Sequence, residues 1–502
     1  MQRFSGILMP ISALPSPYGI GTIGEAARKF ADFLKSAGQK YWQILPIGPT
    51  SYGDSPYQSF SSYAGNPYFI DLDILCAEKL LSKKDLRNID FGCDNKIDYE
   101  KLYNNRFKVL RIAYNNFLTK VKDKNPFEEF CSKNSKWLDN YSLYMSVKAY
   151  FGMKSWTEWE DDEIRLHKPK AIKKYLKLLS DEVNYWKFVQ FKFYEQWQAF
   201  KEYVNNLGIL IIGDMPIYVA MDSADTWASP EVFQLDKDGT PTAVAGCPPD
   251  YFSPTGQLWG NPLYNWEYLK ETNYKWWFSR IKAASKLYDI TRIDHFRAFD
   301  EYYSIPYPAE NAINGEWKKG PNIEFFKKLR RSVGNVPIIA EDLGFMTDSV
   351  IKLLEESKYA GMKVLEFAFD GSETNPYLPQ NFKTDNCVVY IGTHDNDTVL
   401  GWEQTLSDWT KEYVKKVCKI RSNESFAWGL IRTAWGSKAK YAIVQMQDLL
   451  NLGSEARMNT PSTLGGNWVW RANKNIYSKT LAKKLYTLTE KSGRIDLSCK
   501  NT

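Results

Sequence analysis

Four acidic residues stand where four separate apolar segments of the sequence end. Asp214, Asp294, Glu341 and Asp395 each occupy the last position of such a segment or follow it within a few residues. One acid in such a position is most simply a helix cap or an ion-pair partner. Four acids in equivalent positions would repel and desolvate one another at a cost in stability if they served no purpose. The pattern therefore predicts one site whose carboxyl groups take part in chemistry.

Basic and imidazole side chains accompany these acids. Arg292 stands two residues before Asp294 in an extended segment, so both side chains point to the same face. A neighbouring arginine favours the ionised form of a carboxyl group, which a nucleophile requires. Two of the three histidines, His295 and His394, adjoin acids of this set, whereas His167 stands in a lysine-rich helical stretch and is expected at the surface.

Two carboxyl groups of opposite protonation state are the equipment of retaining glycoside chemistry. In this scheme ionised Asp294 attacks the anomeric carbon, and Glu341 protonates the leaving oxygen and later deprotonates the incoming hydroxyl. The charge of Asp294 would help to keep Glu341 protonated before the attack. Asp395 would bind sugar hydroxyls and help to distort the ring towards the transition state. Folding must then bring Asp294 and Glu341 within roughly 5–5.5 Å of each other.

Eight short apolar segments must position these side chains. Most do not alternate with polar residues, as is typical of parallel strands buried on both faces. Helical periods separate most of them, for example over residues 323–333 and 348–357. The sequence therefore predicts an α/β fold, a (β/α)8 TIM barrel, with the acids at its catalytic mouth. The eight segments are residues 6–11, 42–47, 209–214, 290–294, 336–341, 363–369, 387–391 and 441–445.

The spacing of the segments predicts two insertions into the barrel. Residues 76–207 are rich in Lys, Leu, Tyr and Phe and predict a mostly helical insertion after the second strand. Residues 220–270 are rich in Pro, Asp and Trp and predict a loop-rich insertion at the substrate cleft after the third strand. No internal repeat or flexible linker divides the chain, so residues 1–502 are expected to form a single catalytic domain.

Composition excludes several classes of protein. The 65 Lys and Arg against 59 Asp and Glu leave a small surplus without a basic stripe, so no nucleic-acid partner is expected. The longest apolar stretches fall far short of the roughly 20 residues of a membrane helix, so no membrane partner is expected either. Seven cysteines without a CxxC pair indicate reduced thiols in the cytoplasm and no zinc ribbon. We expect a monomer.

Aromatic residues are frequent, and several stand in irregular segments. Among the 18 Trp, 32 Tyr and 27 Phe, Tyr57, Trp259 and Trp468 lie in stretches rich in Gly, Pro and Asn. Most of the aromatic residues must fill the core, but a ring on a loop offers a flat apolar face suited to a sugar. The glycines of residues 19–24 match GxGxxG, but the motif does not follow a strand directly and lacks the later acid, so it does not indicate a nucleotide site.

Longer strings around the acids resemble a known family. Residues 214–218 (DMPIY), 292–297 (RIDHFR), 340–344 (AEDLG) and 393–397 (THDND) closely resemble signatures of the 4-alpha-glucanotransferases, also called amylomaltases or disproportionating enzymes, of the alpha-amylase-like clan. The resemblance runs in order from about residue 4 to Arg471. Further matching strings are residues 14–21, 55–58, 64–67, 246–252 and 257–262.

The resemblance implies a (β/α)8 barrel with inserted subdomains and no C-terminal β-sandwich. It also implies transfer of α-1,4-glucan segments between maltooligosaccharides, without a metal or an organic cofactor. By matching strings, Asp294 is the expected nucleophile, Glu341 the acid/base and Asp395 the third carboxylate. The expected substrate-binding residues are Tyr57, Asp214, Asp250, Trp259, Arg292 and His394.

Two other functions stay open at this point. A plain α-glucan hydrolase would use the same acids, and a non-catalytic glucan-binding barrel would keep the fold without the chemistry. Intact Asp294 and Glu341 argue against the second alternative. Transfer in preference to hydrolysis depends on the resemblance, whereas the retaining glycoside chemistry also follows from the acids themselves.

Overall fold

The centre of the molecule is a sheet of eight parallel strands. The computed structural model describes residues 2–249 and 253–496. The strands follow the order β10-β11-β12-β1-β2-β3-β6-β9. Each apolar segment singled out in the sequence forms one of them, which confirms the predicted parallel sheet. The strands are β1 (Phe4–Leu8), β2 (Tyr41–Gln43), β3 (Leu210–Met215), β6 (Ile290–Ile293), β9 (Ile338–Ala340), β10 (Gly361–Val364), β11 (Cys387–Tyr390) and β12 (Tyr441–Gln445).

The sheet closes into a barrel between its two outer strands. Ile339 of β9 pairs in parallel with Ala360, and the N–H of Ala340 donates to the carbonyl of Ala360 at 2.8 Å. All eight strands contribute buried residues to one apolar cluster, for example Leu8 and Ile212, which fills the interior of the barrel. The predicted (β/α)8 fold is therefore confirmed.

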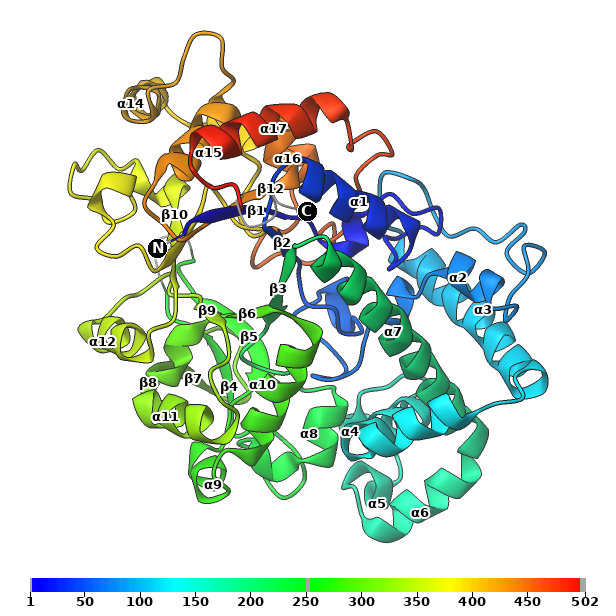
Figure 1. Ribbon diagram of the computed structural model, residues 1–502. Helices are drawn as coiled ribbons and strands as arrows, with labels where there is room; N and C mark the ends of the chain where they lie inside the picture. The colour runs from blue at the N-terminus through cyan, green and yellow to red at the C-terminus, as the bar shows by residue number, and fades with distance from the viewer. Residues whose placement is uncertain (1, 250–252, 497–502) are drawn as a thin grey trace.

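Helices surround the strands (Figure 1). Helix α1 is an example of how they pack. It turns one apolar face inwards, and the ring centroid of Phe30 lies 4.7 Å from that of Trp42 in β2. The helices around the barrel are α1 (Glu25–Ser36), α7 (Ser180–Asn206), α10 (Lys275–Leu287), α11 (Asn322–Ser332), α12 (Asp348–Ser357), α13 (Val399–Thr405), α14 (Asp408–Cys418), α15 (Phe426–Gly436), α16 (Met446–Leu449) and α17 (Lys479–Lys491).

The chain between β2 and β3 is mostly helical, as the sequence predicts. Aromatic contacts join its long helices. Measured between ring centroids, Phe117 lies 5.0 Å from Phe188, and Trp137 lies 5.7 Å from Tyr194. At its far end α7 reaches the barrel, so this helix belongs to both parts, and the boundaries 76–207 stay a prediction. The other helices of the segment are α2 (Leu72–Ala77), α3 (Tyr99–Lys120), α4 (Asn125–Tyr150), α5 (Asp162–Arg165) and α6 (Pro169–Leu178).

The segment after β3 is more regular than the sequence indicates. It contains α8 (Ala224–Ala228), β4 (Ala243–Cys247), β5 (Gln257–Pro262) and α9 (Trp266–Glu271). The strands pair antiparallel with two strands after β6 in the order β5-β4-β7-β8. Sequence analysis missed this small sheet because its partners, β7 (Glu301–Pro306) and β8 (Glu316–Lys319), are short and distant in the sequence.

Close packing explains the glycines of the GxGxxG motif. A Cβ on Gly21 would lie 1.7 Å from the carbonyl oxygen of Ile11, and one on Gly24 would lie 1.9 Å from a carboxylate oxygen of Asp71. The motif therefore lets the chain between β1 and α1 pack tightly. Within residues 2–249 and 253–496, no helix has both the length and the apolar character needed to cross a membrane.

Candidate active site

A cleft of about 700 Å³ opens where the barrel strands end. Its walls come from the chain after β2, β3, β6, β11 and β12 and from strand β5 of the small sheet. Carboxyl groups, amides and aromatic rings line it together, which suits a ligand with polar edges and apolar faces. Residues at the cleft include Tyr57, Tyr218, Trp259, Asp294, His394, Asp395, Asn459 and Trp468.

Arg292 connects three of the four predicted acids. One terminal nitrogen of its buried side chain lies 2.6 and 2.7 Å from the two carboxylate oxygens of Asp214. The other lies 2.9 Å from Oε2 of Glu341 and 3.2 Å from Oδ1 of Asp294. A single guanidinium therefore joins carboxylates from the ends of β3, β6 and β9 and offsets their mutual repulsion.

Asp294 and Glu341 face each other because each extends the backbone hydrogen bonding between adjacent strands of the sheet by one residue. The N–H of Asp294 donates to the carbonyl of Met215, and the N–H of Glu341 to the carbonyl of Ile293, each at 3.1 Å. Since one nitrogen of Arg292 lies within 3.2 Å of an oxygen of each carboxyl group, the two groups are close neighbours. Asp294 lines the cleft and is 28% exposed, and the neighbouring Glu341 is 18% exposed.

The pair favours a proton on Asp294. Burial and the neighbouring Glu341 raise the pKa of Asp294 well above its ordinary range, with Arg292 opposing them. Burial acts in the same direction on Glu341, but Arg292, a hydrogen bond from Asp294 and the N–H of His295 at 2.8 Å lower its pKa to about 2.

This distribution differs from the sequence prediction, which assigned the charge to Asp294. Arg292 lies closer to Glu341 than to Asp294, and His295 adopts a left-handed conformation, with a φ of 47°, in which its N–H donates to Glu341. Both donors stabilise the ionised form of Glu341. In the pocket without a sugar these contacts favour the charge on Glu341, and the charge that the reaction requires on Asp294 stays a prediction.

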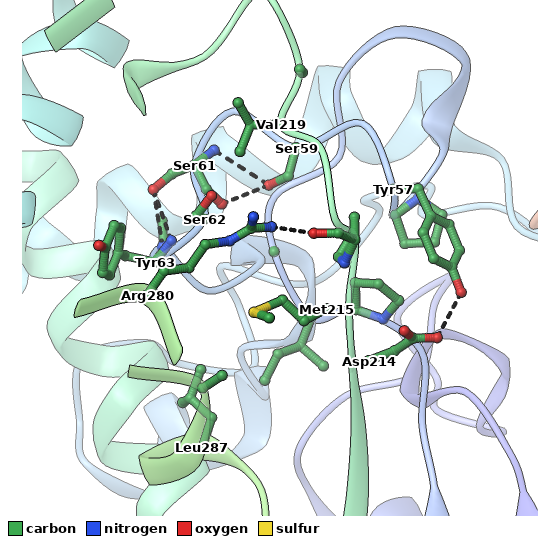
Figure 2. Close-up of a pocket in the computed structure, with 18 of the residues that line it drawn as sticks. Tyr57, Ser59, Ser61, Ser62, Tyr63, Asp214, Met215, Val219, Arg280 and Leu287 are labelled. Carbon is green, nitrogen blue, oxygen red and sulfur yellow. Dashed lines mark hydrogen bonds between the residues drawn. The ribbon is translucent and has the colours of Figure 1, made fainter. Parts of the chain in front are cut away.

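Asp214, Tyr57 and His394 form a second group beside this pair. The Tyr57 hydroxyl donates to Oδ2 of Asp214 at 2.8 Å and lies 2.8 Å from Nε2 of His394. Because the hydroxyl has one hydrogen, Nε2 is the donor in the second bond. The Tyr57 and His394 rings stack 5.3 Å apart at 14°. Figure 2 shows the bond from Tyr57 to Asp214 beside a smaller cavity.

Asp395 lies at the open side of the cleft, with 42% of its side chain exposed. Nδ2 of Asn459 donates to its Oδ1 at 2.7 Å, and Arg457 donates to its backbone carbonyl at 2.8 Å. Its Oδ2 is 3.4 Å from Nε2 of His394. Sequence reasoning missed Asn459 and Arg457 because they stand in an irregular segment, although their position after the eighth strand was an available signal.

The remaining predicted residues have different outcomes. Trp259 borders the cleft, with its ring edge-on to His295 at 4.9 Å. Asp250 lies outside the described residues. The prediction that His167 is at the surface is wrong: it is half-buried, because its ring packs edge-on against Trp227 of α8 at 4.5 Å.

No group of three or more His, Cys, Asp or Glu is arranged to hold a metal ion among the residues that the structure describes. The fold and this site define a class: barrel enzymes with a facing pair of carboxyl groups, equipped for retaining glycoside chemistry. Residues 9–476 match the family model described as 4-alpha-glucanotransferase, and the chain belongs to this family.

Individual relatives match over nearly their full length. A 4-alpha-glucanotransferase of Clostridium butyricum is 52% identical over 492 residues, which cover 97% of this chain and 100% of that protein. One of Thermus thermophilus is 42% identical over 504 residues, covering 99% and 100%. The structure of Streptococcus agalactiae amylomaltase in complex with acarbose matches with a TM-score of 0.96 at 42% identity, covering 99% of this chain and 100% of that one.

Proposed function

We propose that the protein transfers α-1,4-glucan segments from one maltooligosaccharide to another by a retaining double displacement. The observation that carries the proposal is the pairing of Asp294 and Glu341 on one nitrogen of Arg292, at the edge of an open cleft. Membership of the 4-alpha-glucanotransferase family supports transfer as the outcome.

The first displacement begins with the proton that the pair already holds. When the donor sugar enters, this proton passes from Asp294 to Glu341 along the hydrogen bond between them. An oxygen of Asp294 then forms a bond to the anomeric carbon while the bond from that carbon to the leaving oxygen breaks. Glu341 protonates the leaving oxygen, and the outgoing sugar departs with its new hydroxyl.

The second displacement reverses these roles. A hydroxyl of the acceptor sugar gives its proton to Glu341, and its oxygen attacks the anomeric carbon of the glycosyl-Asp294 ester. The ester bond breaks, and Asp294 leaves as a carboxylate. Two inversions restore the α configuration, so the product carries the same kind of linkage as the donor.

The neighbouring residues bind the donor sugar. His394 lines the cleft, whereas the carboxylate of Asp214, held by Arg292 and Tyr57, has no exposed surface without a sugar. Both are proposed to form hydrogen bonds with sugar hydroxyls when the donor is bound. Asn459 occupies one carboxylate oxygen of Asp395, and the exposed part of the group is directed to hydroxyls of the reacting ring. The ring of Trp259, which borders the cleft, offers an apolar face to the sugar. Asp250 is proposed as a further sugar-binding residue from the sequence resemblance alone.

Transfer requires the acceptor to compete with water for the glycosyl ester. Binding and alignment in the cleft raise the effective concentration of the acceptor hydroxyl, and close contact with the walls limits the access of water. The aromatic rings of Trp259 and Trp468 at the cleft favour a second sugar over solvent. No metal or organic cofactor takes part.

The protein acts as a single chain in the cytoplasm. Reduced thiols at Cys76, Cys93, Cys131, Cys387 and Cys418 fit a reducing compartment.

Incubation with maltotriose followed by chromatography of the products tests the proposal. Disproportionation yields glucose together with oligosaccharides longer than maltotriose. A hydrolase with the same acids yields only shorter products, and a non-catalytic barrel leaves maltotriose unchanged; either result would overturn the proposed function. The variant Glu341→Gln is the control for contaminating activity.

A further inference from the structure

A further carboxyl group stands behind the turn that carries His394 and Asp395. Glu366 follows β10 in the short helix Leu365–Ala368, and its N–H donates to the carbonyl of Ile391 at 3.1 Å. The residue is half-buried, and its Oε1 is out of contact with solvent and has no hydrogen-bond partner in the part of the chain that the structure describes. The mechanism above uses none of its atoms.

Asn396 connects Glu366 with this turn. Its Nδ2 donates to Oε2 of Glu366 at 2.8 Å, while its Oδ1 accepts from the N–H and the hydroxyl of Thr393 at 2.9 and 3.0 Å. An amide donates only from its nitrogen side and accepts only on its oxygen side. The acceptor oxygen of Glu366 therefore fixes the orientation of the Asn396 amide, with its nitrogen towards Glu366. In this orientation its oxygen accepts from Thr393 and closes the turn 393–396.

The turn is also held from its other sides. A Cβ on Gly392 would lie 2.8 Å from Oε1 of Glu366 and 2.9 Å from Cβ of Asn396, so these groups are tightly packed. Arg457 donates to the carbonyl of Asp395 at 2.8 Å. The backbone that presents Asp395 therefore lies between two anchors, one at the end of β10 and one after β12.

The surroundings favour a neutral carboxyl group at Glu366. Burial and the nearby Asp448 raise its pKa well above the ordinary range, and Asp397 adds to this, whereas Asn396 and Arg457 oppose it. A neutral carboxyl group still offers its carbonyl oxygen to Asn396. Glutamine is therefore a close substitute for this residue, and leucine, which has a similar size and no acceptor, is not.

We propose that Glu366 is a positioning residue of the transfer reaction: through Asn396 it holds the turn 393–396 so that Asp395 faces the donor sugar. The proposal rests on the proposed function, since Glu366 acts on the reaction only through the residues of this turn. Asp395 acts on the reacting ring when the ring is distorted towards the transition state. The effect of Glu366 is therefore expected in kcat.

A double-mutant cycle on maltotriose disproportionation tests the proposal. Glu366→Leu is expected to lower kcat by roughly tenfold to a hundredfold, a coupling typical of groups in one hydrogen-bond network. Glu366→Gln is expected to stay within about threefold of the wild type, because it preserves the acceptor. In an Asp395→Asn background, Glu366→Leu is expected to change kcat less than about twofold. Asn396→Leu, which has a similar size and lacks the amide donor, should be at least as damaging as Glu366→Leu.

Acarbose binding, measured by calorimetry on the same variants, gives a second cycle that does not depend on turnover. Equal losses from Glu366→Leu in both backgrounds, equal damage from Gln and Leu, or a Glu366→Leu variant that behaves as the wild type would overturn the proposal. If Glu366→Leu does not fold, the Asn396→Leu cycle decides by the same criteria. Unchanged activity and acarbose affinity in Asp395→Asn alone would instead count against the proposed function at that residue.

Discussion

Arg292 determines how the site distributes its charge. Its guanidinium allows three carboxyl groups to share one pocket by bonding to all of them. The positions of these acids were predictable, because each follows an apolar strand directly. The position of the shared proton was not predictable from the sequence. It depends on whether Arg292 lies closer to Glu341 or to Asp294 and on the left-handed conformation of His295.

Loss of the acid/base group should slow turnover without loss of the fold. Glu341→Gln is expected to lower kcat by roughly 10²–10⁴, because proton transfer to the leaving oxygen is lost. Asp294→Asn should be at least as damaging, since no covalent intermediate forms. Steady-state kinetics on maltotriose, together with circular dichroism, measures both effects. Full activity in both variants would show that these residues are not the catalytic pair.

The raised pKa of Asp294 also predicts how stability depends on pH. The folded protein binds this proton more tightly than the unfolded chain, so the associated stability is complete below the unfolded value of about 3.9 and is lost as pH rises through the raised folded value. Asp294→Asn should therefore gain unfolding free energy relative to the wild type from pH 5 upwards, by at most about 1.4 kcal/mol per pH unit.

Urea denaturation at a series of pH values measures this difference. The control is Asp238→Asn, which changes an exposed acid in a turn remote from the site. Parallel pH profiles for the wild type and Asp294→Asn would contradict the assigned position of the proton.

Among the structural elements, those with local signals were the predictable ones. Apolar runs predict the eight barrel strands, and helical periods predict helices such as α12. The small sheet β5-β4-β7-β8 does not, because β4 is paired with β7 by contacts between residues 243–245 and 304–306, which no local pattern encodes. Arg457 and Asn459 were missed because they lie in an irregular segment after β12.

The tight connection between β1 and α1 gives a prediction for stability. Gly21→Ala should lower the unfolding free energy by about 2–4 kcal/mol, because its Cβ would lie 1.7 Å from a backbone oxygen of Ile11. The matched control is Gly436→Ala in α15, where no described atom beyond its chain neighbours and the backbone of its own helix lies within 4 Å of the added Cβ. Chemical denaturation compares the two, and equal stability would contradict the proposed packing role of the motif.

For the molecule as a whole, the barrel supplies the acids and the insertions shape the surface over which glucan chains pass. The chain after β3 adds strand β5 and Trp259 to one wall, and the segment after β12 adds Asn459 and Trp468 to another. Family membership and the cleft agree on a glucan-transferring enzyme, whereas the preferred lengths of donor and acceptor depend on surfaces that no sequence motif marked.

Trapping of the covalent intermediate tests the central claim most directly. In Glu341→Gln, α-maltosyl fluoride should still react with Asp294, because fluoride leaves without the help of an acid, while the loss of the base slows the second displacement. Mass spectrometry of the digested protein should then find the mass of a maltosyl group on the peptide that contains Asp294. A maltosyl group on any other residue, or release of fluoride with no labelled peptide, would contradict the account.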